Sequence, residues 1–221
     1  MKKQTQPHES RRHTLRAVIG IGLLGALVVQ GCSPAHVRDP GAPNPKAQAA
    51  FERGSTALES GRYSAAIPEL YTVLDEHPTH VMARYNLGVA LLRVKQYKET
   101  VDVLTASNEP VVSRQKLQDG VRVPFDVDAD YLHALGTAYQ EQRDFKKSLV
   151  CYEAAIQLNV AHLKSYYARA LTLEAQGEWV VARAAWVDYL SRDPDSAWGD
   201  GARKHLAVVE RRLRDLEVES P

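Results

Sequence analysis

The sequence predicts an all-α fold in which paired helices repeat along the chain and stack as an α-solenoid. The first observation is a set of small residues at equivalent places, separated by 34, 48 and 34 residues. The second is that an aromatic residue follows each small residue by nine positions. A period of about 34 residues with helical patterning is typical of helix–turn–helix arrays. The small residues are Gly54, Gly88, Gly136 and Ala170, and the aromatic residues are Tyr63, Tyr97, Phe145 and Trp179.

Each unit is expected to contain two helices. A small residue on the first helix lets the second approach closely, and the aromatic residue fills the space between neighbouring helices. Gly61 and Gly177 fall between paired helices, where a left-handed residue commonly ends the first one. The array is expected over residues 47–194, in repeats of about 47–80, 81–114, 129–162 and 163–194. Its helices are expected near 46–60, 63–76, 80–94, 97–107, 128–142, 145–158, 162–176 and 179–191.

Short motifs in these units carry a family resemblance. Asn86-Leu87-Gly88 is followed by Leu91, and Leu135-Gly136 is followed by Tyr139. Together with the 34-residue period, these motifs resemble the tetratricopeptide repeat, and the resemblance covers about residues 46–194. It implies a right-handed α-solenoid of about four helix–turn–helix repeats that binds other proteins and performs no catalysis.

The resemblance also implies a binding surface, because the first helix of each tetratricopeptide repeat lines the concave face of the solenoid. Aromatic and apolar side chains dominate that face here, and such grooves take extended or helical peptide segments. The alternative is that several of these side chains simply pack between neighbouring units. The implied concave-face residues are Phe51, Tyr85, Asn86, Val89, Arg93, His133, Thr137, Tyr167 and Leu171.

An excess of 14 residues interrupts the array near residues 106–127. Gly120 and Pro124 exclude a continuous helix there, so we expect a long loop. A long loop inside a regular array is either a functional feature or a tolerated surface insertion. The sequence leaves both interpretations open.

The segment 195–221 begins with an amphipathic pattern that predicts a helix from about residue 196 to residue 217. Such a helix would cap the array and hide the apolar face of the last repeat. With that face covered, we expect the protein to be a monomer. The alternative is a coiled-coil dimer through residues 202–216, because the apolar spacing of 4, 3, 4 and 3 is that of a heptad. The apolar residues are Ala202, Leu206, Val209, Leu213 and Leu216.

Residues 1–31 have the order of a secretion signal, with a basic start, an apolar run over 17–29 and a small residue before Cys32. The apolar run is shorter than the roughly 20 residues that a membrane-spanning helix needs. Val29, Gly31 and Cys32 resemble the lipobox of bacterial lipoproteins, which implies that Cys32 is lipidated and becomes the mature N-terminus. Residues 32–46 then form a proline-rich tether, and acyl chains hold the protein on a membrane.

Export has two possible routes. Residues 10–16, Ser-Arg-Arg-His-Thr-Leu-Arg, resemble the twin-arginine signal, and the alternative is the general secretory pathway. Both deliver the chain outside the cytoplasm, to the periplasmic side of the cell envelope. Ser33, which is not Asp, favours the outer membrane in the lipoprotein family. The glycines at 20, 22 and 25 fit a dinucleotide fingerprint, but they lie inside the leader, without the strand and helix that the fingerprint needs.

Composition limits the classes of function. Removing residues 1–31 takes away five Lys or Arg and one Glu, so the formal net charge falls from +1 to −3 and nucleic acid is not an expected partner. No catalytic motif, cofactor motif or metal-ligand spacing is evident, and Cys151 reads as a small buried residue. We therefore expect a lipid-anchored envelope scaffold or assembly factor that binds one or more envelope proteins. The alternative is an accessory subunit of an exported enzyme or redox complex.

Replacement of Cys32 tests the lipobox. Cys32→Ala should leave an uncleaved precursor without acyl label, because the thiol is the expected attachment point of the lipid. Metabolic labelling with a fatty acid and mass spectrometry would measure this. Cys151→Ala is the matched control and should keep the label. A wild-type protein of mature length that carries no lipid would contradict the prediction.

Overall fold

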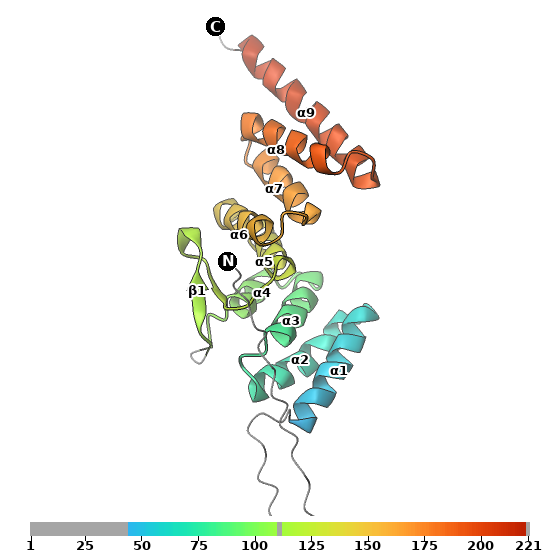
Figure 1. Ribbon diagram of the computed structural model, residues 1–221, viewed down its shortest axis with the longest axis vertical. Coiled ribbons are helices and arrows are strands. Elements are labelled where there is room, and N and C mark those ends of the chain that lie inside the picture. Colours follow the sequence, from blue (N-terminus) through green and yellow to red (C-terminus); the bar gives the residue numbers. More distant parts are fainter. Residues whose placement is uncertain (1–43, 110–111, 220–221) are drawn as a thin grey trace, which may run out of the picture. The chain divides into compact units, whose positions relative to one another are not determined.

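The computed structural model describes residues 44–109 and 112–219, which belong to one compact unit, residues 42–221. The leader, Cys32 and nearly all of the expected tether lie outside the described residues. The described part contains nine α-helices, each of which begins and ends within three residues of an expected helix (Figure 1). They are α1 (Pro45–Glu59), α2 (Tyr63–Glu76), α3 (Val81–Arg93), α4 (Tyr97–Leu104), α5 (Ala129–Glu141), α6 (Phe145–Leu158), α7 (Leu163–Ala175), α8 (Trp179–Arg192) and α9 (Ala197–Glu219).

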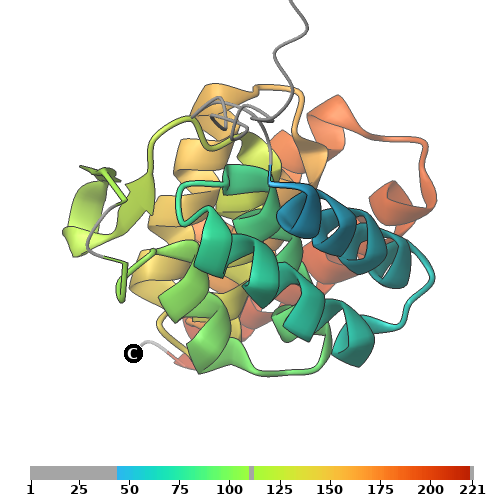
Figure 2. The same cartoon turned by 90° about the horizontal axis from the view of Figure 1, so that it is seen from below.

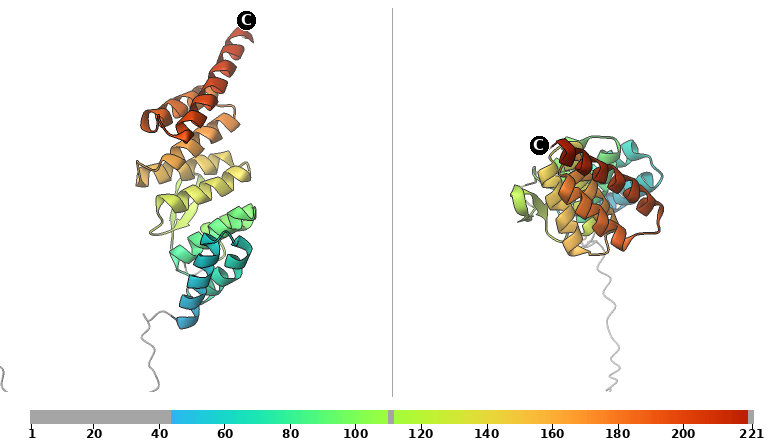
Figure 3. Two further views of the ribbon diagram at one scale, coloured as in Figure 1. Left: turned by 90° about the vertical axis from the view of Figure 1, so that its right-hand side faces the viewer. Right: turned by 90° about the horizontal axis from the view of Figure 1, so that it is seen from above.

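The first eight helices form four helix–turn–helix units. The two helices of each unit pack against each other, and the second helix of each unit packs against the next helix of the chain. The result is a stack from α1 to α9 (Figures 1 and 3). Its interior consists of three apolar clusters, one over α1–α4, one centred on α5 and α6, and one over α7–α9. The predicted α-solenoid is confirmed.

Each unit is held at one close approach between its two helices. A Cβ atom on Gly54 would lie 2.9 Å from Leu70 Cγ, sixteen residues later. At the same offset, a Cβ atom on Gly88 would lie 2.7 Å from Leu104 Cγ, and one on Gly136 would lie 2.7 Å from Tyr152 Cε1. The fourth unit has Ala170 and Trp186 at these positions, both fully buried. A small residue thus accepts one large side chain in every unit.

A left-handed residue follows the first helix of every unit. Gly61 and Gly177 have φ values of 70° and 76°, as the sequence predicts. The equivalent residues of the second and third units are Lys95 and Arg143, with φ values of 64° and 61°. The turn geometry therefore repeats even where glycine does not, at a cost in backbone strain for the two longer side chains.

The insertion is a folded hairpin, which differs from the expected loop. Strands β1 (Arg114–Lys116) and β2 (Arg122–Pro124) pair antiparallel around the short 3-10 turn η1 (Gln118–Gly120). Val121 and Val123, two positions apart, are both buried in the central apolar cluster. The hairpin lies to one side of the helix stack (Figure 2). It folds because it buries apolar side chains, although each strand is only three residues long.

Helix α9 caps the last unit. Ala202 and Val209 are fully buried, and Leu206 and Leu213 pack against the same apolar cluster. His205 stacks on Trp186 at 4.9 Å, and its Nδ1 lies 3.0 Å from Glu174 Oε2. Most of the heptad-spaced apolar side chains therefore pack within the chain, which favours the capping interpretation over the dimer seam.

The close approach at Gly136 can be tested by filling it. Gly136→Leu should lower the free energy of unfolding by on the order of 1–3 kcal/mol, because its Cβ alone would overlap the Tyr152 ring. Thermal unfolding followed by circular dichroism would measure the change. Ala184→Leu, at an exposed position on α8, is the matched control and should change stability little. An unchanged melting temperature for Gly136→Leu would contradict the close approach.

Candidate functional site

The candidate site is a groove of about 580 Å³ bounded by α5, α6, α7, α8 and the start of α9. Its lining combines aromatic rings, aliphatic side chains and two charged residues. Most ligand sites fall between about 300 and 1,000 Å³, so the groove has room for several side chains of a bound segment. The lining residues are His133, Thr137, Gln140, Tyr152, Leu163, Lys164, Tyr167, Ala168, Leu171, Tyr189, Asp193 and Trp198.

Tyr167 on α7 is the centre of the aromatic lining. Its ring meets the rings of Trp186, Tyr189 and Trp198 at centroid distances of 4.9, 5.2 and 5.0 Å, and all three contacts are nearly perpendicular. Such edge-to-face contacts are the arrangement that aromatic pairs prefer. Trp186 is fully buried, whereas Trp198 is 65% exposed. Trp198 therefore packs against Tyr167 and leaves most of its side chain open to solvent.

Two glycines bring the first turn of α9 against this cluster. A Cβ atom on Gly199 would lie 2.6 Å from the carbonyl oxygen of Asp193, and one on Gly201 would lie 3.1 Å from Tyr167 Oη. Any side chain at Gly199 would displace the turn, because the obstacle is backbone. The glycines thus place Trp198 beside α7.

Asp193 is an ionised carboxylate on the groove lining. Its Oδ2 accepts hydrogen bonds from Ser196 Oγ and from the Tyr189 hydroxyl, each at 2.6 Å. These two bonds, with Ser196 first, lower the pKa of Asp193 below its ordinary value. Ser196 Oγ also accepts from the backbone N–H of Trp198 and Gly199, so it caps the start of α9.

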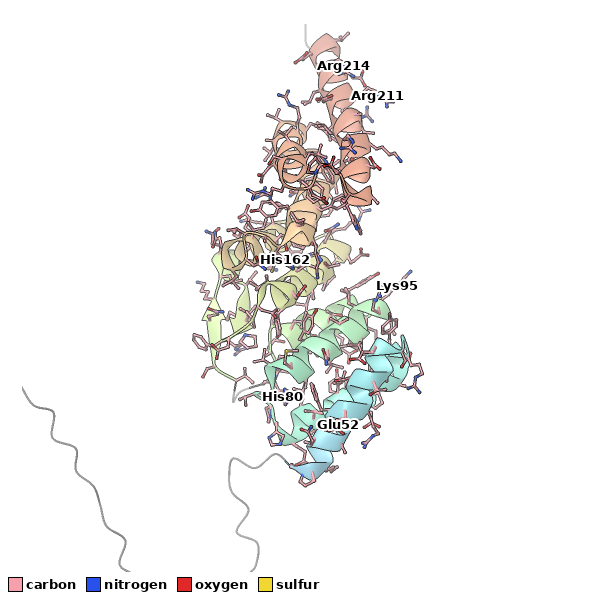
Figure 4. The ribbon with its side chains drawn as sticks, turned by 45° about the vertical axis from the view of Figure 1, so that its right-hand side comes forward. Glu52, His80, Lys95, His162, Arg211 and Arg214 are labelled. Carbon is pink, nitrogen blue, oxygen red and sulfur yellow. The ribbon has the colours of Figure 1, made fainter. Side chains whose placement is uncertain are left out.

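A polar network joins α5 to α7 beside the groove. His162 Nε2 lies 3.2 Å from Asp130 Oδ1, and His162 Nδ1 lies 2.8 Å from Ser165 Oγ. The order Asp, His, Ser is that of a hydrolase triad, but Ser165 is fully buried and its Oγ also contacts His133 Nδ1 at 3.3 Å. The hydroxyl is therefore closed to a substrate, and the network links two repeats. Figure 4 labels His162 in the middle of the stack.

The structure brings four of the nine implied concave-face residues into the groove, namely His133, Thr137, Tyr167 and Leu171. The other five lie on α1 and α3. Three of them contact rings of other segments. The ring centroids of Phe51 and His80 lie 4.9 Å apart, and those of Tyr85 and Tyr131 lie 6.2 Å apart. The guanidinium of Arg93 lies 5.2 Å from the centroid of the Tyr63 ring. Asn86 donates to Ser55 Oγ at 3.2 Å, and Val89 is half-buried. A binding role for any of the nine stays a prediction.

Sequence reasoning missed the far wall of the groove. Tyr189, Asp193 and Trp198 come from the end of α8 and the start of α9, outside the first helices of the four repeats on which the expected concave face was placed. The available signal was the pair Gly199 and Gly201 at the start of an amphipathic helix, because paired glycines on a helix indicate a close approach to a neighbour.

Several residues outside the groove have structural roles. Cys151 is fully buried, and burial raises the pKa of its thiol far above the ordinary value. Asp128 caps α5 by accepting from Tyr131 N at 2.8 Å, and His80 caps α3 by accepting from Ala83 N at 3.2 Å. Within residues 44–109 and 112–219, no three His, Cys, Asp or Glu side chains gather as metal ligands. Among the helices described, none is both long and apolar enough to cross a membrane.

Family comparisons agree with this architecture. Residues 45–106 and residues 129–161 each match a model described as tetratricopeptide repeat. The chain contains tetratricopeptide repeats. The first match spans α1–α4 and the second spans α5 and α6, so the hairpin lies between the two matched segments.

Solved structures with tetratricopeptide repeats share the fold. A MamA double mutant superposes with a TM-score of 0.64 at 17% identity, over 80% of this chain and 90% of that chain. MamA from Desulfovibrio magneticus RS-1, from residue 41 to its end, gives 0.56 at 22% identity, over 68% and 77%. YrrB, described as a TPR protein with an unusual peptide-binding site, gives 0.58 at 16% identity, over 78% and 86%. At these identities the likeness concerns the fold alone.

Two curated relatives are much longer proteins. An N-terminal acetyltransferase A complex subunit-like protein of Schizosaccharomyces pombe is 25% identical over 127 residues, which are 57% of this chain and 16% of that protein. The phagocyte signaling-impaired protein of Drosophila pseudoobscura pseudoobscura is 26% identical over 189 residues, which are 74% of this chain and 18% of that protein. The chain thus spans less than a fifth of either relative.

The half-buried His133 leads us to expect a loss of stability in mild acid. Burial is the first cause that lowers its pKa from 6.5 to about 4; the charges of His162 and Lys164 add to this, and Asp130 opposes it. In the unfolded chain His133 therefore becomes protonated below about pH 6.5, whereas in the folded protein it becomes protonated only near pH 4. The free energy of unfolding should fall over this interval by up to about 1.4 kcal/mol per pH unit.

Chemical denaturation at a series of pH values would measure that slope. His133→Gln should make the fall shallower, because the substituted side chain does not titrate. His80, whose pKa is also lowered chiefly by burial, contributes in the same direction and stays in both proteins. Parallel curves for wild type and His133→Gln would contradict the role of His133.

Proposed function

We propose that the protein is a lipid-anchored scaffold of the cell envelope whose repeats bind an extended segment of another protein. The observation that carries this proposal is the groove with the exposed indole of Trp198 on its wall. Aromatic side chains that are held rigidly and left open to solvent are typical anchors of protein interfaces. No reaction is assigned to the protein.

The lining supports a peptide rather than a small polar metabolite. Leu163, Ala168 and Leu171 supply an aliphatic surface on α7, and the rings of Tyr167 and Trp198 stand against it. Gln140 places an amide on the same lining, where it can bond to a peptide backbone. Apolar pockets with a few placed polar groups bind alternate side chains of a segment in this way.

Membrane attachment rests on the leader and the tether. The lipobox resemblance places the lipid on Cys32, and α1 begins at Pro45 after a proline-rich stretch. Thirteen extended residues at ~3.1 Å each would allow the repeats to stand up to roughly 40 Å from the bilayer. Ser33 favours the outer membrane, so the groove would face the periplasm.

A second candidate uses the same groove. An accessory subunit of an exported enzyme or redox complex would also bind a protein segment. The resemblance of Ser10–Arg16 to a twin-arginine signal favours this candidate, because that route carries folded cargo. The two candidates differ in the partner and share the binding surface.

Truncation of Trp198 tests the groove. Peptides selected against the full-length protein from a displayed random library would supply the ligands. Trp198→Ala should weaken their binding by about 30-fold or more, equivalent to about 2 kcal/mol, because an exposed aromatic anchor is lost. The melting temperature should stay close to that of wild type, since Trp198 is mostly exposed. Calorimetric titration would measure affinity.

Phe125→Ala is the matched control, because Phe125 is a 52% exposed aromatic residue on the segment after β2. It should leave peptide binding unchanged. If Phe125→Ala weakened binding and Trp198→Ala did not, the insertion would be the binding surface. If no library peptide bound the protein, the proposed function would fail.

A further inference from the structure

We infer that the groove accepts a basic side chain of its bound segment, an arginine or a lysine, between the carboxylate of Asp193 and the exposed indole of Trp198. The inference rests on the proposed peptide-binding function and names the chemistry of the ligand at one position. Three observations support it: an unmatched negative charge in the groove, an exposed indole beside it, and a similar arrangement elsewhere in the chain.

The charges on the groove lining are unequally matched. Lys164 and Asp193 are the two charged lining residues. Lys164 Nζ lies 2.5 Å from Asp130 Oδ1, so its charge already has a partner. In the part of the chain that the structure describes, no cationic side chain forms an ion pair with Asp193. A cationic ligand would therefore complete the charge balance of the groove.

The hydrogen bonds of Asp193 keep its carboxylate available to a ligand. Both hydroxyl donors, Ser196 and Tyr189, bond to Oδ2 and lower the pKa of the carboxyl. No side chain of the described residues donates a hydrogen bond to Oδ1, although the backbone N–H of Ser196 also lowers the pKa of the carboxyl. Charge-assisted bonds from a guanidinium or ammonium group to such an oxygen are among the stronger polar contacts in proteins.

Trp198 supplies the aromatic half of the subsite. A cation over an indole face is attracted by the ring quadrupole, and Trp is the best aromatic residue for this contact. Ser196 joins the two halves, because its Oγ donates to Asp193 Oδ2 and accepts from Trp198 N. The carboxylate and the indole are thus held on one short, capped turn.

The chain already contains a filled example of this arrangement. The guanidinium of Arg192 lies 4.2 Å from the centroid of the Tyr166 ring, and Arg192 Nε lies 3.0 Å from Asp188 Oδ1. Arg169 shares both groups, because its guanidinium lies 5.4 Å from the same ring centroid and 3.0 Å from Asp188 Oδ2. One ring and one carboxylate there thus hold cationic side chains. Asp193 and Trp198 provide the same two components on the groove lining, with the position of the cation open.

Other ligand chemistries fit this position less well. An acidic side chain would stand against the charge of Asp193. A purely apolar side chain would remove water from the carboxylate without providing a partner, and an unpaired buried charge is costly. The structure therefore favours a basic residue next to the apolar residues that fill the aliphatic part of the groove.

Two small probes test the inference on the full chain purified in detergent. They are N-acetyl-arginine amide and N-acetyl-norleucine amide, which differ in the guanidinium group. The chain has three tryptophans, so selective labelling of the indole Nε1–H groups gives three NMR signals, and Trp198→Phe identifies the signal from the groove. The arginine probe should shift the Trp198 signal with at least a tenfold lower dissociation constant than the norleucine probe.

Asp193→Asn should remove this preference, because an amide keeps an acceptor for Ser196 and Tyr189 but carries no charge. Asp195→Asn removes one nearby negative charge at an exposed position and is the matched control, which should keep the preference. A norleucine probe that binds equally well, an Asp193→Asn protein that keeps the preference, or no shift with either probe would overturn the inference. Library peptides that bind at Trp198 without a basic residue would overturn it while leaving the proposed function intact.

Discussion

The whole array depends on one contact, the approach of two helices at a small residue that faces a large side chain sixteen positions later. Leu70, Leu104, Tyr152 and Trp186 are these large residues, and all four are almost completely buried. Because protein interiors are close-packed, the contact sets the separation of the helices within a unit and leaves little freedom to change it. Stacking of units then follows from their shared geometry, and so does the surface that the first helices present together.

The groove forms where this regularity ends. A fifth unit would place its first helix against α8, and α9 takes that place with two glycines near its start. The residues that hide the last repeat from solvent, Ala202 and Val209, lie on the same helix whose start supplies Trp198. One element therefore both caps the solenoid and completes the wall of the candidate site. The Glu174 carboxylate fixes this helix by accepting from Trp186 Nε1 and contacting His205.

The sequence was sufficient for the features that repeat and insufficient for those that occur once. The small residues and the aromatic residues nine positions later place eight helices, because equivalent units reinforce each other. The implied groove residues His133, Thr137, Tyr167 and Leu171 follow from the same register. The hairpin was missed because its strands are too short to show a clear alternation of apolar and polar residues in the sequence, although Val121 and Val123 are buried. Asp193 was missed because its importance depends on hydroxyls and a ring that only the three-dimensional structure brings to it.

The division of the interior into three apolar clusters has a thermodynamic consequence. In a linear array each unit is stabilised by its neighbours, so the terminal units open locally at lower free energy than central ones. The cluster over α7–α9 is terminal, and the segment from α7 to the start of α9 supplies eight of the twelve residues that line the groove. Any partner that binds only the closed form must then lower the rate of hydrogen exchange in these helices by mass action. Occupancy of the groove and local folding of the last unit are in this way a single coupled equilibrium.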